Sequence, residues 1–208
     1  MMTDKKKGNL FIISAASGAG KTTLVKELLT LIKDLTLSVS HTTRNPRPSE
    51  IDGKDYFFVT NKIFDQMVKE GKFLETAKCH GSFYGTSRNF VQEVRDAGKD
   101  IIFEIDWQGA KSIKVIYPEA ISIFILPPSL EKLEERLTAR GQDSKDTIRA
   151  RLSAAKSEMS HANKFDYVTI NDDFDAAVQE IQTIINAKKL NIKHHKNNYQ
   201  ILIDQLTK

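Results

Sequence analysis

The sequence predicts a three-layer α/β fold, in which helices cover both faces of a mainly parallel sheet, with two polar insertions. Short apolar runs alternate with amphipathic helical patterns along most of the chain. The runs at 101–106 and 120–126 are almost unbroken, which indicates strands covered on both faces. A polar, arginine-bearing stretch interrupts each half of the alternation, so we expect two mobile insertions in the core.

The first elements are a strand and an amphipathic helix. Residues 10–15 form an apolar run that ends in small residues, and apolar residues then recur at helical spacing from Leu24 to Ile32. Residues 38–40 are candidates for a brief second strand. Two prolines in the following loop exclude a regular ladder there.

The insertion that follows mixes strands with short helices. Strands are expected at 56–59 and 72–77. Thr60 is suited to cap a helix that ends at Gly71, and its apolar residues, expected to face inward, are Ile63, Phe64, Met67 and Val68. A second helix around 90–94 should end at Gly98, after the polar, glycine-containing stretch at 79–87.

The second half alternates more plainly between strands and helices. Its expected strands are 101–106, 120–126 and 167–170. Helices are predicted by apolar spacing over 108–115, 130–137, 152–159 and 174–185. The polar, turn-rich segment 140–151 separates the second and third of these helices.

Composition limits the kind of protein. The 208 residues suffice for one compact domain with insertions, and 31 basic against 27 acidic residues give a net charge of +4. This charge suits anionic ligands, and without a nucleic-acid-binding signature we expect no nucleic acid partner. The single cysteine, Cys79, excludes an internal disulfide. With no convincing signal peptide and no apolar run near about 18 residues, we expect a cytoplasmic protein without a membrane partner.

A glycine-rich loop joins the first strand to the first helix. In AASGAGKTT, Gly18 and Gly20 allow backbone N–H groups to turn toward phosphates at a helix N-terminus. Lys21 would reach the β- and γ-phosphates, and the Thr22 hydroxyl would bind Mg²⁺. The expected ATP-binding residues are Ala15, Ala16, Ser17, Gly18, Ala19, Gly20, Lys21, Thr22 and Thr23. Ala15 replaces the first glycine of the usual pattern, which is tolerable where a strand ends.

Further motifs suggest a family. SVSHTTRNPRP, KDYFF, FLE, FYGTS, EIDWQGA, RGQD and INDDF occur in the order and approximate spacing of guanylate kinases. From about Asn9 to Leu190 the sequence therefore resembles that family. The resemblance implies a P-loop NTPase fold with its core at 9–39, 96–128 and 165–192, a GMP-binding region at 40–95, a lid at 136–158 and a C-terminal tail at 193–208.

The resemblance also implies a reaction. MgATP would phosphorylate GMP, and also dGMP, to the diphosphate by direct in-line transfer. The oxygen of a nucleoside monophosphate is already a nucleophile, so catalysis needs positioning and charge neutralisation rather than a general base.

By resemblance, the GMP site combines arginines, tyrosines and one carboxylate. Arg44 and Arg47 would hold the phosphate, with the hydroxyls of Tyr56 and Tyr84. Glu75 would accept hydrogen bonds from the two adjacent donors of guanine, which adenine lacks. The full implied set is Ser40, Arg44, Arg47, Tyr56, Glu75, Tyr84, Thr86 and Glu104.

Two carboxylates follow one strand. Glu104 and Asp106 are two residues apart and should point to the same face. The resemblance assigns Glu104 to the guanine and ribose side and Asp106 to the Mg²⁺ and phosphate side. Many relatives carry aspartate where Glu104 stands. The alternative is structural, with one carboxylate capping a helix and the other binding a basic side chain.

The lid is expected to supply further arginines. Arg136, Arg140 and Arg151 resemble those that close over ATP, with Arg149 as an alternative to Arg151. The implied catalytic residues are Lys21, Arg44, Arg136, Arg140 and Arg151. Asn171 resembles an asparagine that contacts adenine.

Two other functions remain open at this point. One is a monophosphate kinase with a different base specificity. The other is a non-catalytic interaction module of guanylate kinase type, in which the phosphate loop is usually degraded, whereas Gly20, Lys21 and Thr22 are intact. Assembly into a homo-oligomer is also left open.

Overall fold

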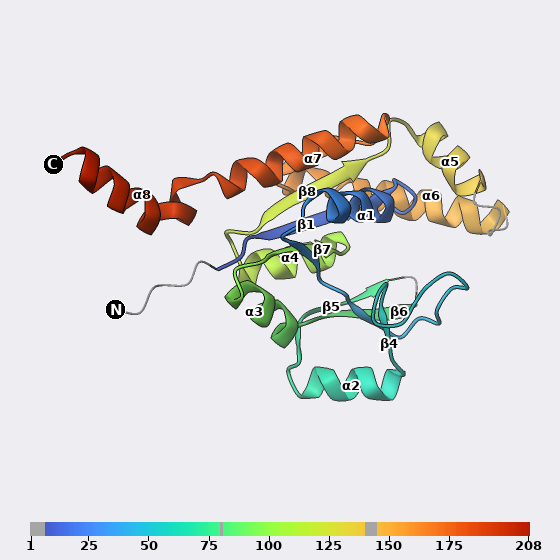
Figure 1. Ribbon diagram of the computed structural model, residues 1–208. Coiled ribbons are helices and arrows are strands. Elements are labelled where there is room, and N and C mark those ends of the chain that lie inside the picture. Colours follow the sequence, from blue (N-terminus) through green and yellow to red (C-terminus); the bar gives the residue numbers. More distant parts are fainter. Residues whose placement is uncertain (1–6, 80, 140–144) are drawn as a thin grey trace.

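Five parallel strands form the central sheet of the computed structural model, in the order β2-β7-β1-β8-β9 (Figure 1). The strands are β1 (Leu10–Ala15), β2 (Leu35–Leu37), β7 (Asp100–Glu104), β8 (Ile121–Leu126) and β9 (Tyr167–Ile170). The structure describes residues 7–79, 81–139 and 145–208, with side chains for all of these except 145 and 192–198.

Helices cover both faces of this sheet. One core cluster joins β1, β7 and β8 to α1 (Lys21–Leu31), α5 (Leu130–Ala139), α6 (Lys145–Met159) and α7 (Phe174–Lys189). The other joins the opposite face of β1 and β7 to α3 (Arg88–Asp96) and α4 (Trp107–Ile116). Alternate residues of β1 supply both clusters, Phe11 and Ile13 on one face and Leu10 and Ile12 on the other. The predicted three-layer α/β fold with a mainly parallel sheet is therefore confirmed.

Residues 41–87 form a separate lobe below the central sheet in Figure 1. Its four strands run in the order β4-β3-β6-β5. The elements are β3 (His41–Thr42), β4 (Phe57–Phe58), α2 (Asn61–Lys69), β5 (Phe73–Cys79) and β6 (Ser82–Ser87). Stacked rings fill the space between α2 and the strands: the Phe64 ring lies 4.8 Å from that of Phe73 and 5.7 Å from that of Phe83.

The chain ends in two helices. After the short 3-10 helix at Ala162–Lys164, β9 leads to α7, and α8 (Ile192–Leu206) follows at the far end of the molecule (Figure 1). The region expected as a tail thus contains a helix. In the described parts of the chain, no helix combines the length and the apolar character needed to cross a membrane.

Three expectations of local structure were wrong. Residues 38–40 form no strand, because the chain crosses there from β2 to β3: the Ser38 amide still donates to Ile102 in the central sheet, while the Ser40 carbonyl accepts from Phe57 in the lobe. Residues 145–151, expected in a turn-rich segment, belong to α6. The polar stretch after Cys79, for which no element was predicted, contains β6, which pairs with β5.

The third concerns α2, which buries only Phe64. Ile63 and Val68, expected to face inward, are about half exposed, with relative accessibilities of 47% and 46%. The lobe is thin, and one aromatic ring of the helix is enough to cover its sheet.

Burial predicts how strongly α4 contributes to stability. Ile113 is fully buried, whereas Ile116 in the same helix is 38% exposed. Ile113→Ala should lower the free energy of unfolding by about 2–5 kcal/mol because it leaves a cavity. Ile116→Ala is the matched control and should cost less than about 1 kcal/mol. Urea unfolding followed by circular dichroism measures both, and equal losses would contradict the assignment of the core.

Candidate active site

The phosphate loop lies between β1 and α1, as its sequence predicts. Gly18 and Gly20 both have φ of 94°, a conformation that side chains disfavour. A Cβ at Gly20 would also lie 2.4 Å from the amide nitrogen of Asn171. Ala15 is the last residue of β1, so it needs no such freedom. Gly18 and Gly20 therefore have room for no side chain, and the loop leads directly into the N-terminus of α1, which suits the binding of a phosphate.

Asn171 holds the phosphate loop through a hydrogen bond of its side chain. Its side-chain amide donates to the Ala19 carbonyl at 2.8 Å, and its own carbonyl accepts from Arg136 Nη2 at 2.8 Å. The residue is 5% exposed and does not line the main cavity. Its side chain supports the loop because a buried loop carbonyl needs a donor, and the expected contact with adenine stays a prediction.

Glu104 lies at the phosphate loop. The Thr22 hydroxyl donates to Glu104 Oε1, and Lys21 Nζ donates to the Ile105 carbonyl at 3.2 Å. Glu104 had been expected on the guanine and ribose side. The pairing with Thr22 instead brings together two oxygen ligands of the kind that Mg²⁺ prefers.

Asp106 caps α4 and lies toward Glu75. Its Oδ1 accepts from the Gly109 amide at 2.8 Å, which is the structural alternative considered for this residue. Its charge is also one cause of the raised pKa of Glu75. Although the strand ends at Glu104, both carboxylates line the same cavity. The expected place of Asp106 near Mg²⁺ stays a prediction.

Glu75 is a buried carboxyl group on β5. It is 6% exposed, and Thr86 on the paired strand β6 donates to it at 2.5 Å. Burial raises the pKa of Glu75 to about 7; the Thr86 hydroxyl opposes this rise, and the Asp106 charge adds to it. A buried acceptor of this kind favours a ligand that brings its own hydrogen-bond donors.

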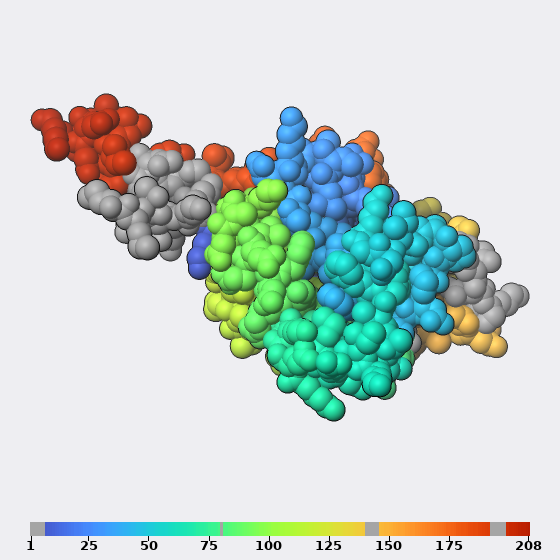
Figure 2. Space-filling view, turned by 60° about the horizontal axis from the view of Figure 1, so that its bottom comes forward, coloured from blue at the N-terminus to red at the C-terminus, as the bar shows by residue number. Residues whose placement is uncertain are grey.

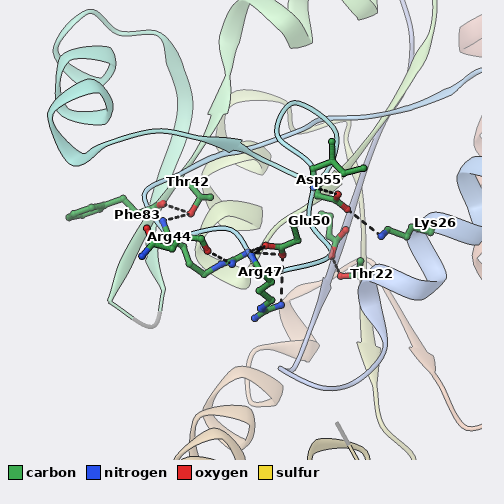
Figure 3. A network of polar contacts seen from close by, with 11 residues as sticks. Thr22, Lys26, Thr42, Arg44, Arg47, Glu50, Asp55 and Phe83 are labelled. Carbon is green, nitrogen blue, oxygen red and sulfur yellow. Dashed lines mark hydrogen bonds and ion pairs between the residues drawn. The ribbon is translucent and has the colours of Figure 1, made fainter. Parts of the chain in front are cut away.

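Arg44 and Arg47 share one carboxylate, Glu50 (Figure 3). Arg44 Nη2 donates to both Glu50 oxygens, and Arg47 Nη1 lies 3.9 Å from Oε1. Partial burial opposes the charge of Arg44, but hydrogen bonds to Glu50 and Tyr84 outweigh it and raise the pKa of Arg44. Burial also raises the pKa of Tyr56, so its hydroxyl stays protonated and can donate.

Arg151 of α6 reaches the phosphate loop. Its Nη2 donates to Ser17 Oγ at 2.9 Å, while Glu158 accepts from the Ser17 amide at 2.8 Å. Arg149 points elsewhere: its side chain is 81% exposed and lies 4.0 Å from Asp146. Of the two candidates, the structure brings Arg151 to the site.

Arg136 and Arg140 are the other two arginines expected in the lid. Arg136 lies on α5, and within the described chain its buried Nη1 has no hydrogen-bond partner. Such a group would gain from an incoming anion. Arg140 lies outside the described residues.

One cavity brings most of these residues together, between the phosphate loop and the lobe. Figure 2 shows the lobe, in cyan to teal, against the blue segment that includes α1. The expected residues that line the cavity are Ala15, Ala16, Ser17, Gly18, Gly20, Lys21, Thr22, Thr23, Ser40, Arg47, Tyr56, Glu75, Tyr84, Glu104, Asp106 and Arg151. Expected residues outside the lining are Ala19, Arg44, Thr86, Arg136 and Asn171.

Two charged residues of the site were missed from the sequence. Glu158 lies seven residues after Arg151 on α6, a spacing of two helical turns that could have indicated a shared face. Glu50 lies in an irregular loop without periodicity, where no sequence signal connects it to Arg44. Both carboxylates accept hydrogen bonds from groups expected to face phosphates.

Known proteins resemble this chain over nearly its whole length. The sequence profile described as guanylate kinase matches residues 7–188. The guanylate kinase of Nitrosospira multiformis is 50% identical over 201 residues, covering 97% of this chain and 96% of that protein. The guanylate kinase of Methylobacillus flagellatus is 51% identical over 200 residues, covering 96% and 99%.

A solved structure agrees. The crystal structure of guanylate kinase from Anaplasma phagocytophilum matches with a TM-score of 0.76 at 34% identity, covering 90% of this chain and 89% of that one. Fold, motifs and relatives lead to the same conclusion: the chain belongs to the guanylate kinase family.

Proposed function

We propose that this chain transfers the γ-phosphoryl group of MgATP to GMP. The observation that carries the proposal is the buried Glu75, hydrogen-bonded to Thr86, in the same cavity as Lys21 of the phosphate loop. One end of the cavity thus suits a base with adjacent donors, and the other suits a triphosphate. Membership of the family supports the same reaction.

Base selection follows from the chemistry of Glu75. Guanine offers a ring N–H and an amino group side by side, and both can donate to one carboxylate. Adenine has an unprotonated ring nitrogen at that position, so it would leave a buried acceptor unpaired at a cost of roughly 1–3 kcal/mol per group. Asp106 faces Glu75 and adds a further acceptor to this end of the cavity.

The arginines and tyrosines of the lobe would bind the phosphate of GMP. Arg47, Tyr56 and Tyr84 line the cavity, and Arg44 lies in the same loop as Arg47. Their guanidinium and hydroxyl groups would orient the GMP phosphate so that one of its oxygens faces the γ-phosphorus. Since that oxygen is already charged, no side chain needs to remove a proton.

The phosphate loop and α6 would bind ATP, the phosphoryl donor. Lys21 and the loop amides would hold the β- and γ-phosphates, and Arg151 and Arg136 would neutralise charge that builds on the transferring group. Thr22 and Glu104 are suited to hold Mg²⁺, beside the expected pair of Thr22 and Asp106. When bound, the ion would neutralise charge on the ATP phosphates. Within the described residues, no three His, Cys, Asp or Glu side chains are grouped so that they could hold a metal ion.

A panel of nucleotides tests the base assignment. With MgATP, kcat/KM for GMP should exceed that for AMP, UMP or CMP by roughly 100-fold or more. Glu75→Gln should lower the GMP value by about tenfold or more, since its amide offers a donor where an acceptor is needed. The control Glu93→Gln changes an exposed carboxylate on α3 and should have no effect. A preference for another monophosphate, or an unchanged Glu75→Gln enzyme, would refute the assignment.

Lys21→Ala separates catalysis from binding of the acceptor. Because Lys21 would contact only the phosphates of ATP, kcat should fall by about 100-fold or more, while the Kd for GMP should change little. Coupled assays and titration calorimetry measure the two quantities. Lys33→Ala, at an exposed lysine beyond α1, should alter neither, and parallel loss of GMP binding in Lys21→Ala would point to a damaged fold.

The raised pKa of Glu75 predicts a pH dependence of stability. In the folded, ligand-free protein this carboxyl stays protonated up to about pH 7, whereas in the unfolded chain it ionises near pH 4.5. The folded state therefore binds an extra proton in this window, and the free energy of unfolding should fall as pH rises from 4.5 to 7, by about 3 kcal/mol at most. The neutral variant Glu75→Gln should lack this loss. Urea unfolding between pH 4.5 and 8 measures the difference, and parallel curves for the two proteins would contradict it.

A further inference from the structure

The loop that carries Arg44 and Arg47 contains the carboxylate Glu50, to which no function has yet been given. We propose that Glu50 is a positioning residue for the acceptor site: it holds Arg44, and the loop around Arg47, in the arrangement that receives the GMP phosphate. This inference rests on the proposed function, in which Arg44 and Arg47 bind that phosphate.

Three hydrogen bonds tie Glu50 to the two arginines (Figure 3). Arg44 Nη2 donates to Oε1 at 2.7 Å and to Oε2 at 2.9 Å. The backbone amide of Arg47 donates to Oε2 at 2.7 Å. One carboxylate therefore fixes a guanidinium group and a turn of the backbone at once.

The surroundings make this pair different from a surface ion pair. The side chains of Arg44 and Glu50 are 21% and 13% exposed, so solvent screens them less than exposed charges. Burial opposes the ionisation of Glu50, but the hydrogen bonds from Arg44 and from the Arg47 amide outweigh it and lower the pKa of Glu50. The carboxylate is consequently charged at neutral pH, and Arg44 has a permanent partner.

Further contacts hold the Arg44 side chain. Its Nη1 donates to the Asn45 carbonyl at 2.7 Å, and its guanidinium carbon lies 5.4 Å from the Tyr56 ring centre and 5.8 Å from that of Phe58. A free arginine side chain samples many rotamers, and fixing it before the ligand arrives removes that entropic cost from binding. Arg47, by contrast, has a side chain that is 60% exposed, and it lines the cavity.

A competing role for Glu50 would be to occupy the arginines in place of phosphate and leave when GMP binds. The contact with the Arg47 backbone argues against this, because withdrawal of Glu50 would also release the turn that presents Arg47. The two roles predict opposite signs. Loss of the carboxylate weakens GMP binding if Glu50 positions Arg44, and strengthens it if Glu50 competes with phosphate.

The test uses Glu50→Gln in the full-length protein. The amide keeps the size of the side chain and one oxygen for the Arg47 amide, but it loses the charge that holds Arg44. We expect KM for GMP to rise about tenfold or more, with kcat and KM for ATP changed by less than about twofold. The matched control is Glu70→Gln, which removes an exposed ion pair with Lys72 in the same lobe and the same unit of charge. It should leave KM for GMP unchanged.

A double-mutant cycle with Arg44→Gln distinguishes positioning from a general loss of structure. If Glu50 acts through Arg44, then Glu50→Gln should have little further effect on KM for GMP in the Arg44→Gln background. Multiplicative effects in the double variant, or an unchanged or lowered KM in Glu50→Gln, would overturn the proposal. If Arg44→Gln alone leaves KM for GMP unchanged, the fault lies instead with the proposed phosphate site. The cycle compares the KM values of folded variants. If Glu50→Gln lowers stability but leaves KM for GMP unchanged, that result refutes the positioning role.

Discussion

Electrostatic repulsion between two phosphate-bearing nucleotides is the constraint around which this site is organised. Two unit charges 4 Å apart interact by about 4 kcal/mol at an effective dielectric constant near 20, and each nucleotide carries more than one charge. The chain meets this with positive groups from separate elements: Lys21 at the start of α1, Arg44 and Arg47 in the lobe, and Arg151 on α6. No single helix or strand could surround both substrates. The central sheet fixes the first of these groups, and the lobe and α6 bring the others toward it.

Carboxylates accept hydrogen bonds from several groups that are expected to face phosphates. Arg44 is held by Glu50, the Ser17 amide by Glu158, and the Thr22 hydroxyl by Glu104. The contacts to Arg44 and Ser17 satisfy polar groups that are partly buried, whereas the contact to Thr22 is exposed. The three carboxylates come from different parts of the chain, so the site is linked across its elements even when empty of nucleotide. This is the physical reason why acidic residues accompany a site built for anions.

The sequence was sufficient for the parts of the protein whose geometry is local. The apolar runs predicted the parallel sheet, and the phosphate loop carries its own conformation in Gly18 and Gly20. Prediction failed where a side chain's role depends on a distant partner. Nothing in the sequence around Asn171 reveals that its side chain donates to the carbonyl of Ala19. Likewise, the two-residue spacing of Glu104 and Asp106 does not reveal that Thr22 donates to the first and the Gly109 amide to the second.

Trp107, the first residue of α4, stacks on His161, which precedes the 3-10 helix, and this contact affects how the protein can be observed. The rings lie 3.7 Å apart between centres, and Lys164 Nζ is 2.9 Å from the imidazole Nδ1. Trp107 is the only tryptophan of the chain, so all indole emission comes from the pocket that it lines with His161 and Lys164. Protonated imidazole quenches indole fluorescence, and desolvation together with Lys164 lowers the pKa of His161. The emission should therefore stay bright to more acidic pH than an ordinary histidine would allow, which gives the chain an optical reporter of the contact between α4 and the residue before the 3-10 helix.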